Sequence, residues 1–305
     1  MPPSHLISRY EGEVQVIRYA EFSDYDRRRQ DANTAINAML AGCRLASHVL
    51  ALTHGATRPL AEIFPSIPRI KLFNLRTDVA SHVLDDAEHH LGLMAVPYIQ
   101  AIHEDYAINC LELLRDHGLT SRTQVKTANA SNLHAKFAVA TGAELEPQAR
   151  EIFRFLRLLR NAVVHRGATA DEEIVTACTE MSVAARELWT KITSEPPPLY
   201  EMGQVVRLGF SETIAELAVT KRLAREMNLA MGTAMPRSFW LGRLVDDFAV
   251  LRDVPPQPSK RVAVAMRLGN FDYGPVAFKH GEVEAELERR GLLYVTGKKE
   301  RGSAS

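Results

Sequence analysis

The residues best suited to chemistry lie in one short segment, residues 150–167, whose sequence is REIFRFLRLLRNAVVHRG. At helical spacing its polar side chains form one continuous stripe made of Arg150, Arg154, Arg157, Asn161 and His165. A guanidinium binds phosphate through a planar fork of donors, and an imidazole can give or take a proton near neutral pH. The stripe therefore predicts phosphate binding beside a group for proton transfer. A solvated basic helix face would show the same pattern, so spacing alone leaves both interpretations open.

A single helix over residues 147–164 must position this stripe. Pro147 suits its first turn, and Gly167 suits the position just after its end. The opposite face is apolar and must meet a core; its residues are Ile152, Leu156, Leu159 and Val163. His165 then lies on the last turn, where unpaired backbone carbonyls and the negative end of the helix dipole raise its affinity for a proton.

The run from Arg160 to His165, RNAVVH, resembles the RNxxxH form of the Arg-x4-6-His motif of the HEPN superfamily, helical domains found in many prokaryotic toxins and defence ribonucleases. Its surroundings are similar as well. An earlier predicted helix carries Glu104, Asp105 and the run from Cys110 to Leu114, a short helix follows at residues 133–141, and a long helix follows the motif. The resemblance covers residues 78–192.

The resemblance implies a metal-independent endoribonuclease of the toxin or defence type that needs no cofactor. In such enzymes the motif histidine acts on the ribose 2′-hydroxyl or the leaving oxygen, and the arginine holds the scissile phosphate. For this chain it implies His165 as the acid and base, Arg160 as the phosphate clamp and Asn161 as an orienting group. The residues expected to bind RNA are Arg150, Arg154, Arg157 and Arg166. An antitoxin or another regulatory protein would be a further partner.

The spacing of the motif also bears on the number of chains in the site. Five residues of ideal helix turn Arg160 and His165 about 140° apart, so within one chain they do not point the same way. Either the helix breaks near His165, or two chains share one site. HEPN proteins commonly pair two motifs across a two-fold interface, so we expect a homodimer in which two copies of this helix end face each other.

Composition narrows the class of protein. The chain of 305 residues balances 37 Lys and Arg against 37 Asp and Glu, which argues against indiscriminate binding of polyanions more than against a local phosphate site. Cys43, Cys110 and Cys178 stand far apart and form no metal or disulfide motif. The sequence has neither a signal-peptide pattern nor a run of about 20 apolar residues, so we expect a cytoplasmic protein without membrane contact.

The expected fold is mainly α and has three parts. These are an N-terminal helical segment at residues 1–76, an HEPN-like helical bundle at 77–195, and a mixed α/β accessory domain at 204–305. The boundary between the last two follows from the prolines at residues 196–198, which stop a helix and favour an extended linker.

Local signals refine this outline. A short strand is expected within residues 10–19, and an alternating stretch at residues 261–268 lies in the accessory domain. Gly92 and Pro97 are expected to interrupt the helical pattern that runs from residue 78 to residue 114.

Two other functions stay open. The central bundle could be a non-catalytic scaffold of HEPN type that binds a nucleotide or a partner protein. The C-terminal part could be a winged-helix DNA-binding regulator, with a recognition helix at residues 281–290 and a basic β-wing at 294–299. Four acidic residues of that helix would be repelled by the DNA phosphates and so argue against insertion into a groove: Glu282, Glu284, Glu286 and Glu288.

A metal site is a further alternative. His82, Asp86 and His90 repeat at intervals of four residues, a spacing that some helical metal sites use, and His89 offers a second pairing with Asp86. Glu104 or Glu112 would have to complete the ligand set from another helix. The pattern lacks a complete set, so we expect no metal.

Overall fold

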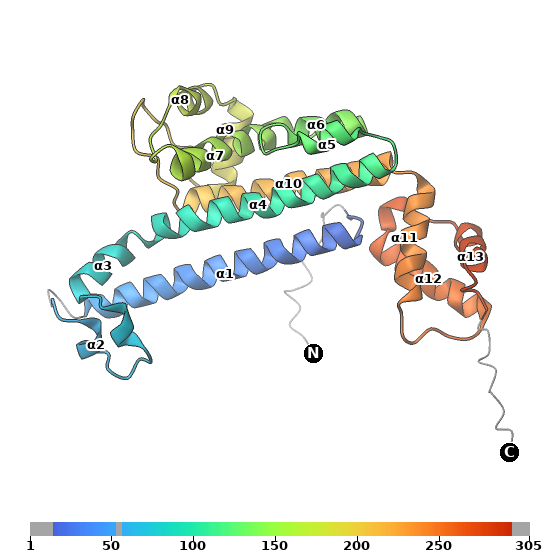
Figure 1. Cartoon of the computed structure of the whole chain (residues 1–305), viewed down its shortest axis with the longest axis horizontal. Coiled ribbons are helices and arrows are strands. Elements are labelled where there is room, and N and C mark those ends of the chain that lie inside the picture. Colours follow the sequence, from blue (N-terminus) through green and yellow to red (C-terminus); the bar gives the residue numbers. More distant parts are fainter. Residues whose placement is uncertain (1–14, 53–56, 295–305) are drawn as a thin grey trace, which may run out of the picture.

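The computed structural model describes residues 15–52 and 57–294, and these residues form a bundle of helices (Figure 1). Three long helices lie at its centre: α1 (Ala20–Ala51), α4 (Ala87–Asp116) and α10 (Phe210–Ala234). α4 packs against both of the others and against α6 and α7, which explains why its apolar residues occupy more than one face. The prediction of a mainly α fold is confirmed.

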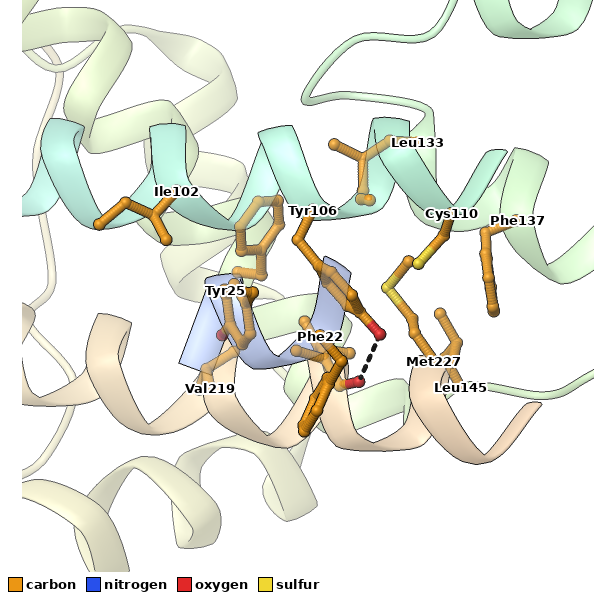
Figure 2. Close-up of a cluster of buried hydrophobic side chains, with 14 of the residues drawn as sticks. Phe22, Tyr25, Ile102, Tyr106, Cys110, Leu133, Phe137, Leu145, Val219 and Met227 are labelled. Carbon is orange, nitrogen blue, oxygen red and sulfur yellow. Dashed lines mark hydrogen bonds between the residues drawn. The ribbon is translucent and has the colours of Figure 1, made fainter. Parts of the chain in front are cut away.

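The core between these helices is rich in aromatic residues (Figure 2). Phe22 and Tyr25 of α1 meet Tyr106 of α4, and the rings of Tyr25 and Tyr106 stack with 4.8 Å between their centroids. The hydroxyl groups of Tyr19 and Tyr106 share a hydrogen bond of 2.9 Å. Because both hydroxyls are buried, this bond supplies a partner that water cannot.

A second layer covers α4 and α10 on the side away from α1 (Figure 1). Its helices are α5 (Arg122–Lys126), α6 (Leu133–Thr141), α7 (Pro147–His165), α8 (Glu172–Thr179) and α9 (Val183–Thr193). α7 packs against α4 and α10 below it and against α8 and α9 beside it. The predicted helix at residues 147–164 is therefore present, and its apolar face is buried in the bundle.

The segment between α9 and α10, where a linker was expected, belongs to the core. Tyr200, Val206 and Leu208 are buried there, and α10 packs against α4, α7 and α9. The buried face of α10, which includes Val219 and Leu223, is covered by these helices together with α1, α6 and η3. One hydrophobic cluster thus extends across residues 195–204, because prolines stop a helix without preventing the following segment from packing.

α4 is continuous through Gly92 and Pro97, which differs from the expected interruption. The break lies earlier, where α3 (Thr77–Asp85) ends. Gly92 is buried against the backbone of Leu208, and a Cβ atom at residue 92 would overlap the Leu208 carbonyl oxygen. Burial on several sides compensates for the backbone hydrogen bond that Pro97 cannot make.

The C-terminal part corrects the expectation of a mixed α/β domain. Its described residues form α11 (Arg237–Ala249), α12 (Pro258–Asp272), the short helix η3 (Gly274–Val276) and α13 (His280–Arg289). The stretch at residues 261–268 is helical because Val262, Ala265 and Gly269 recur at intervals of three and four residues and are buried together.

The two elements of the winged-helix alternative are the basic wing at residues 294–299 and the acidic helix, which is α13. Residues 295–299 of the predicted wing lie outside the described residues. On α13, Glu282 pairs with Arg237, and Glu286 pairs with Arg289 and Arg290, so these acids are engaged in ion pairs.

Residues 15–19, at the start of the described chain, are fixed to α10 by hydrogen bonds of Ile17 and not by a strand. Of the expected strand at residues 10–19, residues 10–14 lie outside the described part, and residues 15–19 have no regular structure. Ile17 donates its backbone N–H to Asn228 Oδ1 at 2.8 Å and accepts from Asn228 Nδ2 at 2.7 Å. Within the described residues, the only β pairing consists of two isolated bridges, Pro59 with Arg76 and Thr169 with Val205.

The C-terminal end of α1 packs against α3, at the same end of the molecule as α2 (Leu60–Ile63) and η2 (Ile70–Phe73) (Figure 1). Within the segment expected to be helical, residues 1–76, the first described helix is α1, which begins at Ala20. No helix in the described part of the chain combines the length and the apolar character needed to span a bilayer.

Candidate nucleic-acid interface

α7 presents the predicted polar stripe on the surface of the second layer. Arg150, Arg154 and His165 are exposed, whereas Arg157 and Asn161 are half-buried. The helix continues to His165, and Gly167 then turns the chain with a left-handed φ of 66°. The stripe is continuous because no break interrupts the helical spacing on which its prediction depended.

Arg160 is half-buried, and its guanidinium contacts Asn161 rather than His165. Its Nη1 donates to Asn161 Oδ1 at 3.0 Å, and its Nε is buried without a hydrogen-bond partner among the described residues. Burial raises the pKa of Glu104 on α4, and the positive charges of Arg160 and Arg157 partly oppose that rise. Arg160 thus lies in the field of Glu104. Within one chain the structure does not bring Arg160 and His165 together.

Arg166 differs from the other arginines of the segment. It forms ion pairs with Asp171 and, at 3.7 Å, with Glu173, both near the start of α8. The two carboxylates neutralise its charge locally and fix the turn between α7 and α8. Of the residues predicted to bind RNA, Arg166 is therefore the one for which carboxylates of the same chain would compete with an RNA phosphate.

Arg150, Arg154 and Arg157 line a hollow of about 340 Å³ between α7 and the start of α6. Among the described residues, none of these three side chains forms a hydrogen bond or an ion pair within 4.0 Å. Burial lowers the pKa of the Arg157 guanidinium, against the opposing effect of Glu173. Ser131 and His134 line it on the side of α6, and Glu151, whose carboxylate accepts from Ser182, lines it on α7. Three guanidinium groups without carboxylate partners make the hollow attractive to an anion.

A buried pair of histidines lies at the base of this hollow and escaped the sequence analysis. His134 lines the hollow, and its Nε2 is 2.8 Å from Nε2 of His103 on α4. Burial lowers the pKa of His103 to about 3 and also lowers that of His134, so both rings are neutral at physiological pH. Phe153 of α7 packs against both rings. The two histidines are 31 residues apart in the sequence, and no local pattern indicates that they meet.

The neutral pair must share one proton across its short contact. One Nε2 donates to the other, and Nδ1 of His103 remains buried without a partner among the described residues. An orphaned donor is rarer in proteins than an orphaned acceptor. We therefore expect His103 to carry its proton on Nε2 and to donate to His134, which leaves the second proton of the pair on Nδ1 of His134.

The residues considered for a metal site do not form one. Asp86 lies at the junction between α3 and α4, so His82, Asp86 and His90 do not follow one another along a single helix. Asp86 pairs with Arg207, and Nδ1 of His89 contacts the backbone of Leu208. The described residues contain no group of three or more histidine, cysteine or acidic side chains arranged to hold a metal ion.

Comparisons with known proteins add no relative: no protein-family model, no curated protein and no solved structure matches the chain. The resemblance to HEPN proteins therefore depends on residues 160–165 and on the order of the surrounding helices.

Proposed function

We propose that the protein binds RNA along α7 and cleaves it without a metal, as an endoribonuclease of the HEPN type. The observation that supports this most directly is the set of three arginines, Arg150, Arg154 and Arg157, around one hollow without carboxylate partners among the described residues. Such cations are available to backbone phosphates, whereas Arg166 already holds two carboxylates.

In the proposed reaction His165 removes the proton of a ribose 2′-hydroxyl. The 2′-oxygen then attacks the neighbouring phosphorus, the bond to the 5′-oxygen breaks, and a protonated group returns a proton to that leaving oxygen. The products are a 2′,3′-cyclic phosphate end and a 5′-hydroxyl end. An arginine stabilises the extra negative charge of the transition state, and the exposed position of His165 leaves its ring open to RNA.

Cleavage on this scheme needs two chains. α7 remains helical to His165, and the Arg160 guanidinium of the same chain is bonded to Asn161 rather than to His165. The guanidinium that faces His165 must then come from a second copy, with two α7 ends meeting about a two-fold axis. Two such ends would also combine their arginines and strengthen the local attraction for a polyanion.

A non-catalytic role is the second candidate. It is favoured by the bond between Arg160 and Asn161, because the side chains of two of the three motif residues bind each other in the absence of a substrate. In that case the hollow would bind a nucleotide phosphate or an RNA backbone, and the reacting groups would stay unused.

Binding and cleavage can be separated with labelled single-stranded RNA and two variants. We expect Arg154→Gln to weaken binding about three- to tenfold and to reduce the slope of log K against log salt by about 0.7, because it removes one phosphate contact. We expect His165→Ala to retain binding and to lose cleavage. Arg27→Gln is a matched control, since Arg27 is an exposed arginine far from α7 on α1.

The outcomes decide between the two candidates. RNA binding that responds to Arg154→Gln without any cleavage by the unaltered protein would favour the scaffold. Equal binding by Arg154→Gln and Arg27→Gln would refute an RNA-binding role for the hollow.

A further inference from the structure

The second half of α1 is apolar on two opposite faces. Ile36 and Leu40 face inward and pack with residues of α4 and α10. On the other side lies a set of exposed small and large apolar residues, which we call the outer stripe: Ala35, Ala38, Gly42, Leu45, Val49 and Leu52. Leu45 is 68% exposed and Leu52 is 75% exposed. A helix that is apolar on opposite sides is normally covered on both, but no described residue of the chain covers the outer stripe.

The spacing of the outer stripe is that of a coiled coil. Its members follow one another at intervals of three, four, three, four and three residues, which are the a and d positions of successive heptads. The flanking e and g positions hold no Asp, Glu, Lys or Arg; they are Met39, Ala41, Ala46 and His48. Between residues 32 and 52 the only Asp, Glu, Lys or Arg is Arg44, which bonds Glu88 of α4 at 2.5 Å. Depletion of charge is characteristic of the buried centre of an interface.

We propose that the outer stripe pairs with the outer stripe of a second copy of the chain, in antiparallel orientation. The residue sizes are complementary in this orientation. A two-fold axis between residues 43 and 44 places Ala35 opposite Leu52, Ala38 opposite Val49 and Gly42 opposite Leu45. These are the a-to-d pairs of an antiparallel coiled coil, and in each pair a small side chain meets a large one.

The alternatives fit less well. Parallel pairing would put Ala35, Ala38 and Gly42 against their own copies and leave a gap at one end, with the three large residues crowded at the other. A helix that lies on a membrane surface carries several Lys or Arg on its polar face, and between residues 32 and 52 the only one is Arg44.

The size of the contact sets its expected strength. From Ala35 to Leu52 the helix rises about 26 Å, so two stripes form a contact at the small end of specific protein interfaces. We therefore expect association in the micromolar range rather than an obligate dimer.

This interface is separate from the one at α7. α4 and α10 lie between α1 and α7 (Figure 1), so pairing through α1 does not bring two α7 ends together. A chain with two different two-fold contacts forms assemblies larger than a dimer. The α1 contact can thus exist whether or not the protein cleaves RNA, and its failure would leave the function proposed for α7 untouched.

Disulfide trapping tests the orientation and the register. Two variants, Ala38→Cys and Val49→Cys, are made in a Cys43→Ser background, while Cys110 and Cys178 are buried and stay in place. Under mild oxidation we expect a cross-linked dimer from the mixture and not from either variant alone, because two Ala38 positions lie about 16 Å apart along antiparallel helices. Cross-linking of Ala38→Cys with itself, or no cross-link in the mixture, would overturn the proposal.

Sedimentation of the full chain over 1 to several hundred micromolar tests the strength. We expect Leu45→Glu to raise the dissociation constant of the α1 contact at least about thirtyfold with an unchanged helical circular dichroism spectrum. Val139→Glu is the matched control, since Val139 on α6 is 85% exposed and lies outside α1. A monomeric unaltered protein over this range, or equal dissociation constants for Leu45→Glu and Val139→Glu, would refute the interface.

Discussion

Because Glu216 of α10 is buried, we expect the free energy of unfolding of the protein to fall steeply as pH rises. The side chain is fully buried, and its Oε2 accepts a hydrogen bond from Gln100 Nε2 at 3.1 Å. Oε1 of Glu216 and Oε1 of Gln100 are buried without partners among the described residues, so a proton on the carboxyl would supply the donor that both lack. Burial raises the pKa of Glu216 to about 8, the negative charge of Glu104 adds to the rise, and the bond from Gln100 opposes it.

The direction and size of the effect follow from proton linkage. In the unfolded chain the carboxyl loses its proton near its ordinary pKa of 4.5, whereas the folded protein retains it to about pH 8. Between these values the unfolded state binds fewer protons, so the free energy of unfolding falls as pH rises. Each pH unit costs about 1.4 kcal/mol, and the loss between pH 5 and pH 7.5 is therefore about 3 kcal/mol.

The assay compares the unaltered protein with Glu216→Gln by urea unfolding at pH 5, 6, 7 and 7.5. A glutamine keeps an oxygen that can accept from Gln100 and has no proton to lose, so we expect its stability to gain about 3 kcal/mol relative to the unaltered protein over this range. Glu201→Gln, at an exposed glutamate, controls for the general effect of removing a carboxylate. A difference between unaltered protein and Glu216→Gln that does not change with pH would refute the reasoning.

Two predictions concern close contacts of the backbone, and both are measured by urea unfolding. Gly92→Ala is expected to destabilise the protein by about 1–3 kcal/mol because its Cβ would overlap the Leu208 carbonyl; Gly281→Ala, with no atom near the added carbon, is the control, and equal stabilities would contradict the contact. Asn228→Ala is expected to cost about 2–4 kcal/mol because the N–H and the carbonyl of Ile17 both lose their partner. We also expect a protease to cut the Asn228→Ala variant faster on the N-terminal side of α1. An unchanged rate of cleavage there would argue against the role of Asn228 in holding Ile17.

The accuracy of the sequence predictions depended on how local each signal was. The apolar period of residues 147–164 correctly located α7, because a stripe at 3.6-residue spacing has to be buried whatever its partner. The alternating stretch at residues 261–268 was misread as non-helical, since Val262, Ala265 and Gly269 gain their burial only from the neighbouring helices. Gly92 suggested an interruption because the approach of Leu208, 116 residues later, is invisible along the chain.

The same distinction applies to the candidate site. The identity and order of the polar residues on α7 could be read from the sequence, because residues three and four apart share one face of any helix. The sequence could also indicate that Arg160 and His165 of one chain diverge. The sequence could not indicate which arginines have a carboxylate partner. Arg166 pairs with Asp171 and Glu173, whereas Arg150 and Arg154 form no such pair among the described residues.

By itself, then, the sequence determined that the protein is helical and that α7 carries a basic stripe ending in a histidine. Each of these is a periodicity, which the geometry of a single helix converts into a face. Only the tertiary structure decided that His103 meets His134 below the arginines, that the charge of Arg160 acts on Glu104, and that no described residue covers the outer stripe of α1. These depend on which helices become neighbours, and that choice is made by burial of the whole chain rather than by any one segment.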